Sequence, residues 1–195
     1  MIKIKNIFFI FLAFLMALIV ALSNYLVQFP ITYAGLQEIF TYGAFSYPVA
    51  FLITDLANRR YGKKIAMKIV YIGFIFGICL TLYFSTDFTN LISKRIALAS
   101  GSAFIFAQTL DVQVFHRLRK KIWFIAPLVS SLAGSTVDTF LFFSIAFYGT
   151  GINWISLSFG DLFVKILVAL IMLIPFRILL SYIKEITNIE QKISG

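Results

Sequence analysis

Apolar residues fill six long stretches of the chain, and short polar or charged segments separate these stretches. They are residues 7–28, 36–57, 65–84, 95–115, 123–148 and 158–182. An α-helix needs about 20 predominantly apolar residues to cross the hydrocarbon core of a bilayer. The pattern therefore predicts an all-α integral membrane protein, in which residues 1–195 form one domain with six transmembrane helices in a single bundle.

The composition supports lipid as the solvent of this chain. Hydrophobic residues make up 61% of it and charged residues only 13%, and the mean hydropathy is +0.94. Soluble domains have about a quarter of their residues charged, so this chain has too few polar side chains to cover a water-facing surface.

The basic residues predict the orientation of the helices. Fourteen of the 17 Lys and Arg lie before the first stretch or after the second, fourth and sixth, whereas the opposite loops hold only Lys94 and Arg95. Cytoplasmic loops carry an excess of Lys and Arg, which predicts that both termini lie in the cytoplasm and that the protein resides in a bacterial cytoplasmic membrane. The same clustering explains the net charge of +9 without a nucleic-acid partner.

The first stretch has a second interpretation. Lys3 and Lys5, the apolar run and "ALS" (21–23) also fit a signal peptide with a small-residue cleavage site. The length of the run favours a membrane helix instead, and the five further stretches do not need a signal peptide for insertion.

Catalytic and metal-binding motifs are absent from the sequence. One histidine and one cysteine cannot form a ligand set at zinc spacing. There is no HExxH motif and no Walker loop, and no Ser–His–Asp arrangement accompanies the buried acids. We therefore expect neither an enzyme nor a metal or other cofactor.

Ionisable residues nevertheless lie within the apolar stretches, where they are costly and usually face the bundle interior. In the fourth stretch Gly101, Phe104, Gln108 and Asp111 share one helical face at steps of three, four and three. His116 is the first residue of the basic loop that follows this stretch, and we therefore expect its side chain to be solvated.

The other stretches carry similar groups. Ser131, Ser135 and Asp138 converge in the fifth, and Asp161 and Lys165 are four residues apart in the sixth, where we expect them to neutralise each other. Asp55 and Asn58 end the second, and here two interpretations remain open. Asp55 either pairs with Arg59 at the membrane edge or belongs to a binding site.

Small residues predict close helix packing in two places. "GFIFG" (73–77) has glycines at GxxxG spacing, and Ala13, Ala17 and Ala21 form a small-residue stripe. The stripe also resembles the alanine spacing on the first helix of energy-coupling-factor substrate-binding subunits, which would use it to dock a partner.

Several motifs together resemble the queuosine precursor transporter (VUT) family of small six-helix membrane proteins. They are "SNYLVQFP" (23–30), "TYGAFSYPVAFLITDL" (41–56), "AQTLDVQVFHRLR" (107–119), "STVDTFLFFSIAF" (135–147) and "DLFVK" (161–165). They follow in order over nearly the whole chain. Ala107 stands where the family pattern leads us to expect glycine, and its small side chain still permits tight packing.

The resemblance implies import of 7-deazaguanine precursors of queuosine, namely 7-cyano-7-deazaguanine (preQ0) and its aminomethyl relative (preQ1). A carboxylate can accept the paired N–H groups of such a ligand, an amide can donate to its carbonyl oxygen, and an aromatic ring can stack on its face. From this chemistry, the candidate binding residues are Asn24, Phe45, Tyr47, Asp55, Asn58, Phe104, Gln108, Asp111, Ser135 and Asp138.

Two alternatives to a self-sufficient carrier remain open from the sequence. The chain could be a substrate-binding subunit that needs an energy-coupling partner, or a membrane structural or assembly protein without a ligand. Homo-oligomerisation is open as well.

Overall fold

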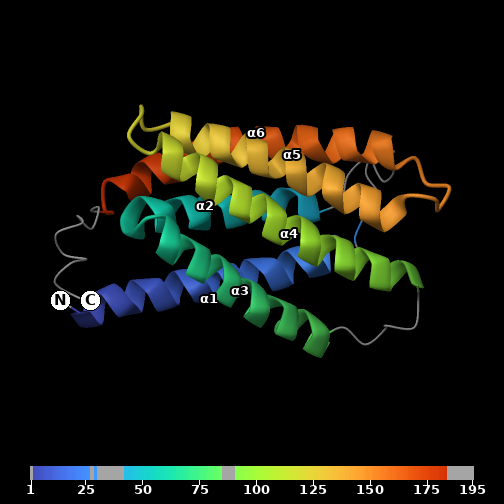
Figure 1. Ribbon diagram of the computed structural model, residues 1–195, viewed down its shortest axis with the longest axis horizontal. Helices are drawn as coiled ribbons and strands as arrows, with labels where there is room; N and C mark the ends of the chain where they lie inside the picture. Colours follow the sequence, from blue (N-terminus) through green and yellow to red (C-terminus); the bar gives the residue numbers. More distant parts are fainter. Residues whose placement is uncertain (1, 27–28, 30–41, 85–90, 184–195) are drawn as a thin grey trace.

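The computed structural model describes residues 2–26, 29, 42–84 and 91–183, and all of its regular elements are helices (Figure 1). These are α1 (Ile2–Leu26), α2 (Gly43–Tyr61), α3 (Lys63–Phe84), α4 (Leu91–Leu118), α5 (Ile125–Phe147) and α6 (Trp154–Leu180). Each helix covers most of one predicted stretch, which confirms the all-α prediction. Residues 36–41 of the second stretch and 85–90 of the loop after the third lie outside the described residues.

Among the residues that the structure describes, three helices are long and apolar enough to cross a membrane. The qualifying segments are Ile7–Leu26, Ile125–Phe147 and Trp154–Leu180. Polar side chains within α2 and α4 lower the hydropathy of those two helices. Length and composition therefore indicate a helical membrane protein.

The central position in the bundle belongs to α2, which contacts each of the other five helices. In Figure 1, α5 and α6 lie above it, α1 and α3 lie below it, and α4 crosses in front of it. Most of the side chains of α2 are buried as a result. A polar residue on this helix is consequently held away from lipid.

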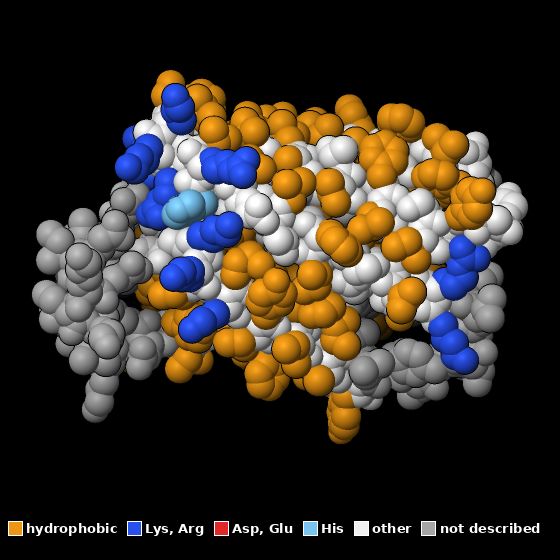
Figure 2. Space-filling model, viewed as in Figure 1, with side chains coloured by type: hydrophobic (Ala, Val, Ile, Leu, Met, Phe, Trp, Pro, Cys, Tyr) orange, Lys and Arg blue, Asp and Glu red, His pale blue; other side chains and the backbone are white. Residues whose placement is uncertain are grey.

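The outer surface is apolar along the sides and basic at one end. Phe11 and Phe159 are 51% and 60% exposed and represent the hydrophobic sides. Figure 2 shows Lys and Arg gathered where α2, α4 and α6 end, and the single histidine lies among them. By contrast, the four acids that the structure describes are all buried, with at most 6% of their surface exposed.

A close helix contact joins α1 to α3. A Cβ atom placed on Gly77 would lie 2.7 Å from Val20 Cβ, and one on Gly73 would collide with Met16. The same positions lie 3.0 and 3.2 Å from the backbone oxygens of Ala17 and Ala13. The structure thus confirms the packing contact predicted for the glycines. It also buries two alanines of the stripe against α3, so the stripe does not favour docking of an outside partner.

Three arginines donate hydrogen bonds to backbone oxygens near the ends of helices. Arg119 donates to the backbone oxygen of Arg59 at 2.9 Å, and Arg59 donates in return to the backbone oxygen of Arg119. At the opposite end, Arg95 donates to the backbone oxygens of Ile145 and Tyr148, which belong to the unsatisfied carbonyls at the end of α5. These contacts fix α4 against α2 and α5 at both of its ends.

Candidate functional site

Polar side chains form a column through the middle of the bundle, between α2, α4, α5 and α6. Its fully buried members, apart from the charged ones, are Thr54, Asn58, Gln108, Ser130, Ser135 and Thr139. A buried polar atom is expected to have a hydrogen-bond partner. The atoms in this column that lack one therefore mark the positions where a ligand would be useful.

Asp111 and Gln108 hold the largest group of unpartnered atoms. Gln108 Oε1 accepts a hydrogen bond of 2.6 Å from Thr54 Oγ1 on α2, which fixes the amide and leaves its Nε2 without a partner. Both carboxylate oxygens of Asp111 are unpartnered as well, although the side chain is fully buried. The two residues lie one helical turn apart on α4, so a free donor and two free acceptors are neighbours.

Asp55 on α2 is the third member of this cluster, and we refer to Asp55, Gln108 and Asp111 as the Asp111 group. Ser130 Oγ on α5 donates to Asp55 Oδ1 at 3.2 Å, and Asp111 is close enough to Asp55 to repel it electrostatically. The alternative of an Asp55–Arg59 ion pair is therefore wrong. The arginine extends instead to the end of α4, where it bonds the backbone of Arg119.

Asn58 and Ser135 extend the column in both directions. Asn58 Nδ2 donates to the backbone oxygen of Val112 at 2.9 Å, while its Oδ1 has no partner. The hydroxyl of Ser135 is also unpartnered and fully buried. It lies one turn before Asp138 on α5, between the Asp111 group and the charged group described below.

A small cavity opens beside Asp55 between α2, α5 and α6. Its wall is formed by Pro48, Leu52, Asp55, Pro127, Ser131, Ala169, Met172, Leu173 and Phe176. Its volume is about 10 Å³, close to what one water molecule needs. Asp55 is the only ionisable group in this wall.

Lys165 forms a second buried group with two acids. Its Nζ lies 2.6 Å from Asp161 Oδ2 and 2.8 Å from Asp138 Oδ2, and it donates to Thr139 Oγ1 at 3.1 Å. The predicted pairing of Asp161 with Lys165 is confirmed, and Asp138 joins it. Asp138 thus forms an ion pair with Lys165. The sequence pattern predicts instead that Asp138 shares one ligand site with Asp111. We refer to these three charged residues as the Lys165 triad.

The remaining candidates lie toward the other end of the column. Ser100 Oγ donates to Asn24 Oδ1 at 2.7 Å and lies 3.0 Å from the Tyr47 hydroxyl. The Tyr47 ring lies under Lys165, 5.3 Å from its Nζ. Asn24 and Tyr47 therefore lie nearer to the Lys165 triad than to Asp111.

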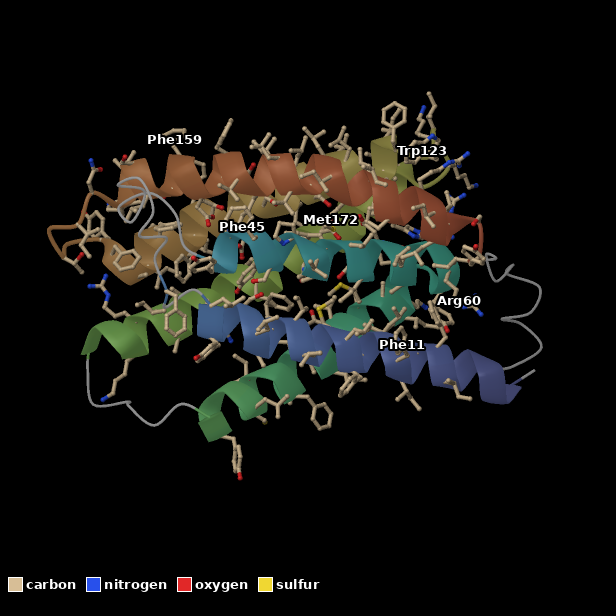
Figure 3. All side chains as sticks on the ribbon, turned by 180° about the vertical axis from the view of Figure 1, so that it is seen from behind. Phe11, Phe45, Arg60, Trp123, Phe159 and Met172 are labelled. Atoms are coloured by element: carbon tan, nitrogen blue, oxygen red, sulfur yellow. The ribbon has the colours of Figure 1, made fainter. Side chains whose placement is uncertain are left out.

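The two phenylalanines differ in their surroundings. Phe104 is buried and stacks on Phe74 with ring centroids 5.3 Å apart, within the α1–α3 side of the core. Phe45, at the start of α2, is 48% exposed (Figure 3). Phe104 thus packs in the core, and Phe45 lies at the surface of α2.

Two contacts were missed by sequence reasoning. Thr54 orients Gln108, and Ser130 bonds Asp55. The sequence signal for Ser130 was available, because it precedes Ser131 directly and lies two turns before Asp138. A serine in a membrane helix, however, often bonds only its own backbone, so the sequence could not decide between the two. No group of His, Cys, Asp or Glu within the described residues is suited to hold a metal ion.

The chain was compared with known families and proteins. Residues 41–180 match the family described as "Putative vitamin uptake transporter". The "Queuosine precursor transporter" of Escherichia coli (strain K12) is 35% identical over 177 residues, which are 81% of this chain and 79% of that protein. The "Probable queuosine precursor transporter" of Haemophilus influenzae is 35% identical over 85% of this chain and 83% of that protein. A "Probable queuosine precursor transporter" of Bacillus subtilis is 30% identical over 68% of this chain and 68% of that protein. No solved structure matches significantly.

The matched segment includes α2, α4, α5 and α6 and thereby every residue of the Asp111 group and the Lys165 triad. A family of transporters accords with a polar column that lacks catalytic machinery. The chain belongs to the VUT family of membrane transporters.

Proposed function

We propose that this protein imports queuosine precursors, the 7-deazaguanines preQ0 and preQ1, across a bacterial cytoplasmic membrane. Two relatives that match about four-fifths of the chain are named as queuosine precursor transporters, which supports this substrate class. The proposed topology has six spans with both termini in the cytoplasm, because the basic residues gather at one end of the bundle (Figure 2).

The observation that carries the proposal is the set of unpartnered atoms on α4. A 7-deazaguanine presents two adjacent donors, the ring N1–H and the exocyclic amine, and next to them one carbonyl acceptor. Asp111 offers two free acceptor oxygens, and Gln108 offers a free amide donor one turn away. The ligand edge and this helix face are therefore complementary in both the type and the order of their groups.

Burial makes this complementarity selective. Asp111 is fully buried and Gln108 is 1% exposed, so water does not replace a missing ligand group. A site built to hydrogen-bond its ligand rejects molecules that lack those groups, because its own buried polar atoms then stay unpaired. Asn58 Oδ1 is a further candidate acceptor next to the same helix segment.

The enclosed site also implies movement. Asp111 is fully buried, Thr54 of α2 bonds the neighbouring Gln108, and α5 packs along α4. A ligand can therefore reach Asp111 only if α4 separates from one of these helices. The structure therefore corresponds to a closed form of the carrier. Asp138, held by Lys165, and Ser135 would contact the ligand only after such a rearrangement.

The direct test is binding and uptake of labelled preQ0 and preQ1 by the purified protein, in detergent and in liposomes. Asp111→Asn keeps the shape but turns a donor toward the ligand's own N–H. We expect about 5- to 150-fold weaker binding, because such a mismatch costs about 1–3 kcal/mol. Thr136→Val, a change on the exposed side of α5, is the matched control and should bind normally.

A ligand variant tests the same contact from the other side. A 7-deazaguanine analogue without the exocyclic amine loses one of the paired donors. It should bind more weakly to the wild type, yet Asp111→Asn should discriminate far less between the two ligands. Uptake in liposomes without any partner protein also separates a carrier from a subunit that depends on an energy-coupling partner. Normal binding and uptake by a stable Asp111→Asn protein would refute the proposed site.

A further inference from the structure

The buried acids differ in how their charges are balanced. In the Lys165 triad one ammonium group lies between two carboxylates at 2.6 and 2.8 Å. Asp55 on α2 and Asp111 on α4 lie between two contacts that join these helices, from Thr54 to Gln108 and from Asn58 to the backbone oxygen of Val112. No Lys or Arg that the structure describes forms an ion pair with either acid. Two neighbouring acids without a counter-ion at the centre of a membrane protein therefore need an explanation.

Two ionised carboxylates repel each other strongly in such a place unless water surrounds them. Charged side chains are costly inside a membrane, and adjacent carboxylates share one proton because their like charges repel. The two oxygens of Asp111 and the Oδ1 of Asn58 have no partner in the protein. These vacant acceptors are an independent sign that a positively charged or N–H-bearing species joins the group during the transport cycle.

A proton fits the site better than a metal cation. Hard cations take six or more oxygen ligands. Asp55 and Ser131 are the only polar side chains in the wall of the cavity beside Asp55, and its volume of about 10 Å³ suffices for one water molecule. A proton requires a single carboxylate oxygen and a short path of this kind.

We propose that Asp55 holds a proton that is imported together with each ligand molecule, while Asp111 grips the ligand. This inference rests on the proposed function and adds its driving force. One proton from the outer solution joins the Asp55–Asp111 pair and leaves it with one negative charge. The paired N–H groups of the ligand then bind the ionised Asp111, which keeps the proton on Asp55. Release of both to the cytoplasm leaves the pair doubly ionised and solvated by the water that enters the emptied site, so each cycle moves one ligand and one proton inward.

The charged and titratable groups around Asp55 can be named for each neighbouring helix. On α4 the facing acid is Asp111. On α5 the nearest polar group is Ser130, and α6 contributes only Ala169, Met172, Leu173 and Phe176 to the cavity. On α2 itself Arg59 lies one turn on and bonds the end of α4. The Lys165 triad is the competing proton site, two turns further along α5.

The experiment measures ligand accumulation in liposomes that contain the purified protein, with the membrane potential clamped at zero. An outside that is one pH unit more acidic should drive about tenfold accumulation of preQ0 in the wild type, because one proton across one pH unit corresponds to a factor of ten. A sodium gradient at equal pH should drive none. Asp55→Asn should lose the response to the pH gradient, while the ligand still equilibrates down its own gradient.

Two matched variants locate the proton. Asp161→Asn removes one acid of the Lys165 triad and leaves Lys165 paired with Asp138. Thr136→Val changes the exposed side of α5 and removes no ionisable group. Both should keep the tenfold accumulation. A triad variant that loses the response while Asp55→Asn keeps it would overturn the inference, and so would accumulation driven by sodium alone.

A chemical readout covers the case in which Asp55→Asn does not fold. Dicyclohexylcarbodiimide modifies protonated carboxyl groups in apolar surroundings, and mass spectrometry of the wild type should find Asp55 modified. Modification confined to Asp138 or Asp161 would refute the assignment. If the wild type binds neither precursor at equilibrium, the proposed function itself fails and this inference with it. Binding without any proton-driven accumulation overturns the inference alone.

Discussion

Lys165 is expected to be the most sensitive position in the interior, because it alone serves two buried acids. Its Nζ lies within 3.1 Å of Asp138, Asp161 and Thr139, and its side chain is only 5% exposed. Lys165→Met keeps much of the volume but leaves two neighbouring carboxylates without a cation. Removing one partner of a buried ion pair costs about 3–5 kcal/mol, and this triad should lie at the upper end of that range.

The acids themselves should be less sensitive. Asp161→Asn leaves Lys165 paired with Asp138 at 2.8 Å. This variant loses about one hydrogen bond, or about 0.5–1.5 kcal/mol. The triple variant Asp138→Asn, Asp161→Asn and Lys165→Met contains no unpaired charge. It should therefore be more stable than Lys165→Met alone.

Thermal stability in detergent tests this order. For a chain of this size, 1 kcal/mol shifts the melting temperature by about 2–4 °C. Lys165→Met should therefore melt about 6–20 °C below the wild type, and Asp161→Asn about 1–6 °C below it. The fraction that remains monodisperse by size exclusion after heating provides the measurement. The reasoning is refuted if the melting temperature of Lys165→Met equals that of the wild type, or if the melting temperature of Asp161→Asn is lower than that of Lys165→Met.

Three further predictions concern other parts of the molecule. Gly77→Leu should separate α1 from α3 and lower the yield of folded protein, because a Cβ there already meets Val20 at 2.7 Å; normal yield and stability would contradict this contact. With exposed Cys79 replaced by serine, Lys120→Cys should react with an impermeant thiol reagent only in opened cells, and labelling in intact cells would contradict the proposed topology. Partial burial and the nearby cations lower the pKa of His116 below 6.5. Since the folded state then binds fewer protons, the histidine favours folding above that pH and loses this contribution as the pH falls; an NMR titration that gives 6.5 or higher would contradict it.

The helices could be predicted from the sequence because their signal is local. Each predicted stretch overlaps one observed helix, and the GxxxG spacing of Gly73 and Gly77 identifies the α1–α3 contact. The pairing of Asp161 with Lys165 was also predictable, since residues four apart on a helix are neighbours. In all these cases the contact depends on helical periodicity or on a backbone that can be approached closely.

Side-chain contacts between different helices could not be predicted from the sequence, because they depend on the rotation and the axial position of each helix relative to its neighbours. Asp138 lies one turn from Ser135 and two turns from Ser131, which suggested a common ligand site with Asp111. The rotation of α6 instead brings Lys165 to Asp138. Similarly, Arg59 lies four residues after Asp55 but extends toward the end of α4. Local spacing shows which partner is possible, and tertiary packing decides which one is used.

The burial of the described acids has a consequence for the surrounding lipids. The described part of the molecule presents almost only positive charge at its surface, concentrated at one end (Figure 2). At that end Arg177 also lies over the ring of Trp123, a residue type that anchors at the membrane interface. Each Lys or Arg near an anionic leaflet contributes about 1 kcal/mol of attraction, so negatively charged headgroups should collect around this end and hold the protein at a defined depth and tilt. In a bilayer of neutral lipids the same fold would lose that attachment, and reconstitution for transport assays should therefore include anionic lipid.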